Sequence, residues 1–279
     1  MLKRLYQWLR QRMRHWLRPR PIPDALWHAT LAAYPFLQNA SDLPKLRQLC
    51  SRFLAQKEFH GTHGLVVTDE IALAIAAQAC LPVLHLGLHW YKDFVGIVVY
   101  PGAMLAQREV RDSAGVVHRY REPLAGQAMH QGPVVLNWQD VSQAGASAAQ
   151  GTNLVIHEFA HKIDLYGAPQ DADADGCPPL PGGFGGTPRS ALGARNAREL
   201  WRKTLYAAYE QFANQVQVAQ RFGTLVQAPW LDAYGATSPA EFFAVTLEAY
   251  FVARPDFALH YPSLLPLYDA FFRRPQAAL

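Results

Sequence analysis

The sequence predicts an α+β fold in which a small mixed sheet lobe is followed by a helical lobe. Three observations lead to this prediction. Residues 83–138 contain short β-rich runs separated by Gly, Pro, Asp and Ser, residues 197–252 carry apolar residues at helical spacing, and an apolar helical stretch at 153–163 lies between them. At 279 residues, 50% of them hydrophobic, the chain can build a large core. We expect the mixed lobe at about 24–166 and the helical lobe at about 194–279, with a cleft between them.

Each expected element has a local reason in the sequence. Apolar residues recur at helical spacing over 41–59, and Thr68-Asp69-Glu70 opens a second apolar helix that Pro82 ends. After a long Gly-, Pro- and Asp-rich loop at 167–193, the chain becomes mostly helical. The expected strands, rich in β-branched and aromatic residues, are 83–86, 94–100, 116–120 and 133–138, and the expected later helices are 197–216 and 240–252.

Residues 1–23 are expected to form a separate basic amphipathic segment and linker. Residues 1–20 hold seven basic residues and no acidic one, interleaved with Leu, Trp and Tyr. Of the 26 basic residues in the chain, 19 therefore lie elsewhere, against 22 acidic ones, so the remainder has a net charge of −3. Direct nucleic-acid binding is not expected. The segment fits a membrane surface, a partner protein and the chain's own domain equally well.

The cellular compartment is expected to be the cytoplasm. The N-terminal segment lacks the uninterrupted apolar run of a signal peptide or of a membrane span. The three cysteines, Cys50, Cys80 and Cys177, are far apart and form no C-x-x-C pair. This pattern fits a reducing compartment and indicates neither a disulfide framework nor a cysteine zinc site.

The most informative motif is His157-Glu158-Phe159-Ala160-His161, an H-E-x-x-H sequence. Side chains at positions i and i+4 of a helix share one face, so one divalent ion can bind both His157 and His161. Glu158 lies about 100° around the helix from His157, where it can orient a water molecule and accept its proton. Apolar neighbours place this helix in the interior, where a metal would supply the partners that the buried histidines need. The motif predicts a zinc peptidase.

A catalytic zinc ion normally takes three protein ligands, so one more is required. The metzincin pattern would need Gly at position 164 and His at 167, where this sequence has Asp164 and Gly167. Glu241 is notable because it lies in the first turn of an apolar helix, yet Ser238-Pro239-Ala240-Glu241 is also a capping box that needs no metal. Both interpretations stay open, and Glu248 is a rival two turns further along. The downstream candidates are Glu199, Glu210, Glu241, Glu248 and His260.

Two further side chains are candidates for supporting roles. Asp164 follows His161 by three residues and can accept a hydrogen bond from the far ring N–H of a metal-binding histidine, although a solvent-facing position at the helix end is equally compatible. Tyr234 can donate its phenol hydrogen to a tetrahedral oxyanion, although a loop tyrosine more often serves packing.

The loop at 167–193 contains a run that imitates a calcium site. Asp171-Ala172-Asp173-Ala174-Asp175-Gly176 matches the start of an EF-hand loop, but Gly182 stands where a bidentate Glu belongs. We therefore expect no calcium site here.

Three stretches together resemble the Mlc titration factor A (MtfA) family of zinc-dependent peptidases over roughly residues 30–275. They are Val-Ile-His157-Glu158-Phe-Ala-His161-Lys-Ile-Asp164, Asp232-Ala-Tyr234-Gly-Ala-Thr-Ser-Pro239-Ala240-Glu241-Phe-Phe-Ala-Val and Gly132-Pro-Val-Val-Leu-Asn-Trp138. The combination is far more specific than H-E-x-x-H alone.

The resemblance implies a zincin-like fold and a gluzincin-like site, in which His157, His161 and Glu241 bind one Zn²⁺ ion, Glu158 is the general base and Tyr234 donates a hydrogen bond in the transition state. It implies a cytosolic enzyme with aminopeptidase-like activity on small peptides. It further implies binding to the transcriptional repressor Mlc, which relieves repression of sugar-uptake genes.

Three functional hypotheses follow. The first is a zinc metallopeptidase whose peptide substrate pairs with an edge strand at 134–138. The second is a regulator-binding protein with little or no catalysis, in which zinc is structural. The third is a membrane-surface protease recruited by residues 1–20.

Overall fold

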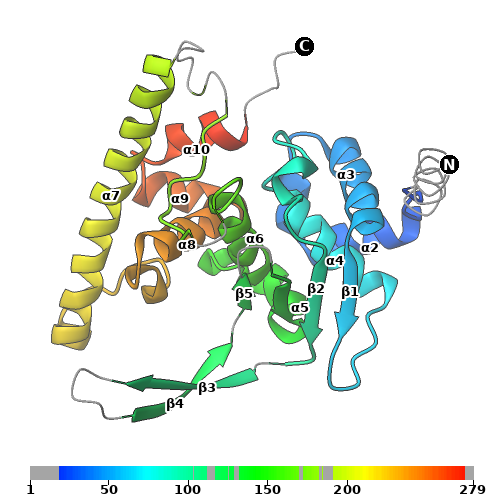
Figure 1. The fold of residues 1–279 in the computed structure, drawn as a ribbon, viewed down its shortest axis with the longest axis horizontal. Helices are drawn as coiled ribbons and strands as arrows, with labels where there is room; N and C mark the ends of the chain where they lie inside the picture. The colour runs from blue at the N-terminus through cyan, green and yellow to red at the C-terminus, as the bar shows by residue number, and fades with distance from the viewer. Residues whose placement is uncertain are drawn as a thin grey trace, which may run out of the picture.

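The computed structural model describes residues 19–102, 104–111, 117–124, 126–128, 132–169, 172–181, 184 and 191–273 (Figure 1). The helices are α2 (Asp24–Ala33), α3 (Leu43–Gln56), α4 (Asp69–Cys80), α5 (Trp138–Ser147), α6 (Leu154–Asp164), α7 (Ala191–Phe222), α8 (Pro239–Val252), α9 (Arg254–His260) and α10 (Leu265–Phe272). The strands are β1 (Glu58–Gly61), β2 (Gly96–Tyr100), β3 (Met104–Arg111), β4 (Val117–Leu124), β5 (Gly126–Ala128) and β6 (Val134–Asn137).

The arrangement places helix α6 in the middle of the molecule (Figure 1). The strands β1 and β2 with helices α2–α4 lie on one side of α6, and helices α7–α10 lie on the other side. Short helical turns connect these elements, among them η6 (Ala233–Ala236) just before α8. The mixture of helices with a small sheet confirms the predicted α+β class, whereas the division into two lobes stays a prediction.

The sheet has the strand order β1-β2-β6-β5. Strands β1, β2 and β6 run parallel, and β5 pairs antiparallel with β6. Strand β2 alternates in burial, with Ile97 and Val99 fully buried, and Val134 and Leu136 of β6 are fully buried as well. This two-residue period is expected of strands that cover a core on one face. Strands β3 and β4 form a separate antiparallel hairpin, which projects from the body in Figure 1.

Two expectations about strands are wrong. Residues 83–86 form turns after α4, and their apolar side chains enter the core without strand pairing, because a short apolar run cannot distinguish a strand from another buried segment. Residues 134–138 are not an edge strand, since β6 lies between β2 and β5 and Trp138 already begins α5. Within the described sheet, the edge strand beyond β6 is β5.

Helix α6 starts at a cap and is held by a continuous apolar core. The side chain of Asn153 accepts a hydrogen bond from Ile156 N at 2.9 Å, which satisfies one of the free N–H groups of the first turn. Phe159 is fully buried and packs on Phe53, Tyr91 and Phe94. These contacts fix the helix on the side of α3 and of the segment between α4 and β2.

Some predicted features lie outside the described residues. The basic stretch at 1–18 is one of them, as are Asp171 and Gly182 of the EF-hand-like run. Among the helices that the structure describes, none is long and apolar enough to cross a membrane.

Candidate metal centre

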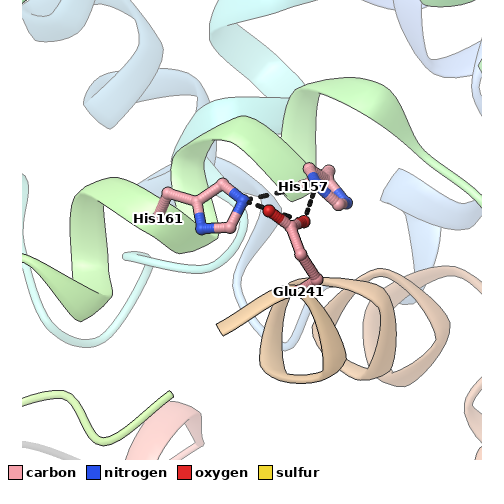
Figure 2. A group of neighbouring side chains, drawn as sticks. All are labelled: His157, His161 and Glu241. Atoms are coloured by element: carbon pink, nitrogen blue, oxygen red, sulfur yellow. Dashed lines mark hydrogen bonds and ion pairs between the residues drawn. The ribbon is translucent and has the colours of Figure 1, made fainter. Parts of the chain in front are cut away.

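Three side-chain atoms from two helices converge on one point between α6 and α8 (Figure 2). His157 Nε2 lies 3.0 Å from Glu241 Oε2, His161 Nε2 lies 3.4 Å from the same oxygen, and the two ring nitrogens are 3.3 Å apart. Zinc bonds of about 2.0–2.1 Å at tetrahedral angles would place donor atoms roughly 3.3–3.4 Å apart. The three atoms therefore fit the ligand set of one metal ion.

The two helices bring these three side chains together for simple geometric reasons. His157 and His161 share the face of α6 that is turned toward α8, as i and i+4 residues must. Ser238 caps α8 by accepting a hydrogen bond from Glu241 N at 3.2 Å, while the Glu241 carboxylate is directed at the histidines. The capping interpretation and the ligand interpretation of Glu241 are thus compatible. The backbone N–H of Glu241 takes part in the cap, and its side-chain carboxylate remains available to a metal ion.

Glu248 lies on the opposite side of the His157 ring. Its Oε1 is 2.7 Å from His157 Nδ1, and its Oε2 accepts a hydrogen bond from Asn153 N. The carboxylate therefore contacts the ring nitrogen that faces away from Glu241, and it is not part of the donor group. The two glutamates that the sequence left as alternatives thus contact different nitrogens of His157.

The remaining candidate ligands lie away from the donor group. Glu199 and Glu210 are exposed on α7. His260 is exposed at the end of α9, where its ring stacks on Trp230 at 4.9 Å. Across the part of the chain that the structure describes, the group of His157, His161 and Glu241 is the one set of three metal-binding side chains.

The ionisable groups of the centre shift one another's pKa values. Burial alone would raise the pKa of Glu241, but hydrogen bonds to His157 and His161 lower it to about 2. Burial alone would lower the pKa of His157, but its bonds to Glu241 and Glu248 raise it well above the ordinary value. Burial raises the pKa of Glu248 despite its bond to His157. The imidazoles and carboxylates therefore compensate for each other's desolvation, as a bound cation would do for the carboxylate.

Glu158 is buried beside this group with an unsatisfied oxygen. It is 2% exposed, and its Oε2 has no hydrogen-bond partner. Burial raises the pKa of Glu158 to about 7, although nearby His157 and His161 lower it. A buried carboxylate oxygen without a partner is costly in a purely structural site, whereas a proton acceptor with a pKa near 7 suits general acid–base chemistry.

Tyr234 lies at the open side of the group. It belongs to η6, is 50% exposed, and its ring centroid lies 6.1 Å from that of His157. The short helix is fixed by Asp232, whose side chain accepts a hydrogen bond from Tyr234 N at 2.9 Å. A half-exposed tyrosine side chain beside the partly buried His157 is in a position to contact a bound molecule.

Comparison with known proteins gives a consistent result. The model of the family described as glucose-regulated metallo-peptidase M90 matches residues 5–273. The chain belongs to this metallopeptidase family. It is 36% identical to Mlc titration factor A of Klebsiella pneumoniae subsp. pneumoniae over 250 residues, which cover 89% of this chain and 85% of the relative. Proteins with the same name from Cronobacter sakazakii, 36% identical over 90% of this chain and 86% of theirs, and from Salmonella arizonae, 34% identical over 90% and 91%, are similarly related.

Asp164 has a different role in this M90 chain from the one that its spacing suggested. Its Oδ2 accepts a hydrogen bond from Gly176 N at 2.8 Å, and Gly176 O in turn accepts one from Trp201 Nε1 at 3.0 Å. No hydrogen bond joins Asp164 to His161 in the described residues. The carboxylate instead attaches the loop after α6 to the motif helix, and the contact to a ring N–H predicted for Asp164 is made by Glu248.

Sequence reasoning missed the partnership between Glu248 and His157. The available signal was the seven-residue spacing from Glu241 to Glu248, which places both carboxylates on one face of α8 two turns apart. Because α6 and α8 pack side by side, such a pair can reach the two nitrogens of one imidazole. Spacing within α8 could not reveal that packing.

Asp164 predicts a specific pH dependence of stability. Burial raises its pKa from the ordinary 3.8 to about 7. Between these values the unfolded state releases a proton that the folded state keeps, so the contribution of Asp164 to stability falls as pH rises from about 4 to about 7. Asp164→Asn removes this loss and retains an acceptor for Gly176 N. We expect the unfolding free energy of the variant, relative to the parent, to rise by about 2–4 kcal/mol over this range in urea titrations.

The matched control is Asp173→Asn, which changes an exposed carboxylate in the same loop and should leave the pH profile unchanged. Parallel profiles for Asp164→Asn and the parent would contradict the assignment.

Proposed function

We propose that this chain is a zinc-dependent metallopeptidase in which His157, His161 and Glu241 hold the zinc ion and Glu158 is the general base. The observation that carries the proposal is the combination of three donor atoms separated by 3.0–3.4 Å with a buried carboxylate, that of Glu158, whose Oε2 has no hydrogen-bond partner. Membership of a metallopeptidase family supports the same conclusion.

The proposed zinc identity follows from the chemistry of the donors. Two imidazoles and one carboxylate are a common ligand set of catalytic zinc, and three protein ligands leave a position open. A structural site would be closed by a fourth Cys or His, which the described residues do not place here. A bound zinc ion supplies a Lewis acid, which lowers the pKa of water and polarises a carbonyl oxygen.

Two protein side chains supply the proton transfer and the stabilisation of the oxyanion. Glu158 accepts a proton from the attacking water and passes it to the leaving amine, for which its pKa of about 7 is suited. Tyr234 donates a hydrogen bond to the oxyanion that develops on the substrate. Glu158 is only 2% exposed, and its apolar surroundings strengthen its electrostatic interactions because the local dielectric constant is low.

A peptide substrate would pair with the edge strand β5. Lys162 of α6 donates a hydrogen bond to Gly132 O at 2.9 Å, which holds the start of β6 on the motif helix. Strand β5 pairs with β6 and contacts α6, so its free edge lies beside the helix that carries the site. An edge strand offers unpaired backbone groups to an extended peptide. The aminopeptidase-like cleavage of small peptides that the resemblance implies is part of this proposal.

A second proposed function is binding of a transcriptional repressor in the cytoplasm. The relatives carry the name Mlc titration factor A, which describes an interaction with Mlc for those proteins. We propose that this chain binds a repressor of the same kind. The regulatory and catalytic proposals are independent, because one needs a surface and the other needs Glu158.

Substitution of the general base tests the catalytic proposal. Glu158→Gln keeps the shape of the side chain and removes its ability to accept a proton. We expect unchanged zinc content and a fall in kcat of at least ~10²-fold on small peptides with a free amino terminus. The control is Glu210→Gln, an exposed glutamate whose replacement should leave kcat unaltered. Full activity of Glu158→Gln would refute the base assignment.

Removal of the third ligand tests the metal site. Glu241→Ala should lower zinc occupancy, measured by elemental analysis after dialysis against a weak chelator, and reduce peptidase activity in proportion. Glu199→Ala, at an exposed position considered as an alternative ligand, should retain both. Equal zinc content in the two variants would exclude Glu241 from the ligand set.

The regulatory proposal is tested by capture of purified Mlc on the immobilised chain. We expect the parent and Glu158→Gln to bind Mlc with equal affinity, because the buried carboxylate of Glu158 is not available to a protein surface. Absence of binding at micromolar concentrations would contradict the proposal. Deletion of residues 1–20, followed by the same capture and by sedimentation with anionic liposomes, tests whether that segment serves the partner or a membrane.

A further inference from the structure

Glu248 occupies an unusual place for a carboxylate, deep between α6 and α8. Its side chain is 8% exposed, and both of its oxygens have partners. Oε1 lies 2.7 Å from His157 Nδ1, and Oε2 accepts a hydrogen bond from the backbone N–H of Asn153. A buried carboxylate with this environment is retained only where its hydrogen bonds compensate for desolvation.

The contact to Asn153 continues into a buried polar chain. Asn153 Nδ2 donates to Gln78 Oε1 at 2.8 Å, and Gln78 Nε2 donates to Ala74 O at 3.0 Å. The other side-chain atom of Asn153 caps α6 through Ile156 N. Every link in this chain has a fixed donor and acceptor, so Oε2 of Glu248 is committed to the backbone of Asn153 and Oε1 alone remains for the histidine.

The contacts of His157 then indicate which ring nitrogen keeps a hydrogen when zinc is bound. Both nitrogens face a carboxylate, with Nδ1 2.7 Å from Glu248 Oε1 and Nε2 3.0 Å from Glu241 Oε2. A zinc ion on Nε2 would need the lone pair of that atom, so the neutral ring would keep its hydrogen on Nδ1, where the Glu248 carboxylate accepts it. His161 has no comparable protein partner on Nδ1 within the described residues. A protein carboxylate therefore contacts Nδ1 of His157, whereas no described carboxylate contacts Nδ1 of His161.

We propose that Glu248 is a positioning residue that holds His157 in the tautomer with Nδ1 protonated and thereby sets the affinity of the site for zinc. The inference rests on the proposed function, since it takes His157 as a zinc ligand. Glu248 acts through His157 and does not contact the metal or the substrate. Carboxylate partners of this kind typically contribute 10–100-fold to metal affinity.

The variant Glu248→Gln separates this role from simple packing. An amide has one acceptor and one NH₂ donor group, whereas the site presents two donors, Asn153 N–H and His157 Nδ1–H. In either orientation of the amide, its NH₂ group faces one of these two donors, and that hydrogen bond is lost. If the amide oxygen faces Asn153, the NH₂ group favours a hydrogen on Nε2 of His157, where the zinc ion would bind.

The control is Gln78→Met, which breaks the buried chain at its far end. It leaves Asn153 Nδ2 without its partner and should lower the thermal midpoint, but it does not touch the bond from Glu248 to His157. A comparison of the two variants distinguishes a general loss of stability from the loss of the hydrogen bond between Glu248 and His157.

The experiment measures the zinc dissociation constant by competition with a fluorescent chelator, and the tautomer of His157 by ¹⁵N NMR of the zinc-loaded protein. We expect a 10–100-fold weaker zinc affinity for Glu248→Gln, an affinity within twofold of the parent for Gln78→Met, and Nδ1-protonated His157 in the parent. Equal zinc affinity of Glu248→Gln and the parent would overturn the inference, as would a hydrogen on Nε2 of His157 in the parent. A parent chain that binds no zinc at His157 would instead refute the proposed function.

Discussion

The packing of α6 against α8 is the constraint on which the site depends. The interface is mostly apolar, yet it also contains His157, Glu158 and Glu248, all with little exposure. Unpaired charges in such an interior are strongly destabilising, so the polar groups must satisfy one another or a ligand. The opposite pKa shifts of Glu241 and His157 record this mutual compensation.

The two helix caps connect this packing to the chemistry. Asn153 starts α6 with its side chain and at the same time donates its backbone N–H to Glu248. Ser238 starts α8 at the residue that places Glu241 in the first turn. The polar contacts that cross the interface are those from Asn153 to Glu248 and from His157 to Glu241, and they restrict the register of the two helices more than apolar packing alone would.

The local parts of the structure were the predictable ones. The spacing within His157–His161 fixes which face of the helix carries the ligands, and the apolar runs correctly located α3, α4, β2, α8 and most of α7. The predictions that failed concern the pairing of segments that are distant in the sequence. The apolar residues 83–86 could not be distinguished from a strand. The edge position was assigned to β6 because no local sequence pattern indicates the short strand β5. The contrast between Glu241 and Glu248 likewise required the position of α6, which lies more than 80 residues earlier in the chain.

The hydrogen bond from Asn153 to Glu248 also bears on the order in which the protein folds during synthesis. These residues are 95 positions apart, and Glu241 follows His157 by 84 positions. Contacts of such long sequence separation form late, after the entropy of closing the intervening chain has been overcome. During synthesis, α6 therefore emerges with only two of the three donor side chains, His157 and His161. The complete group of three donor atoms arises only when α8 docks, so the candidate metal centre forms no earlier than this long-range packing step.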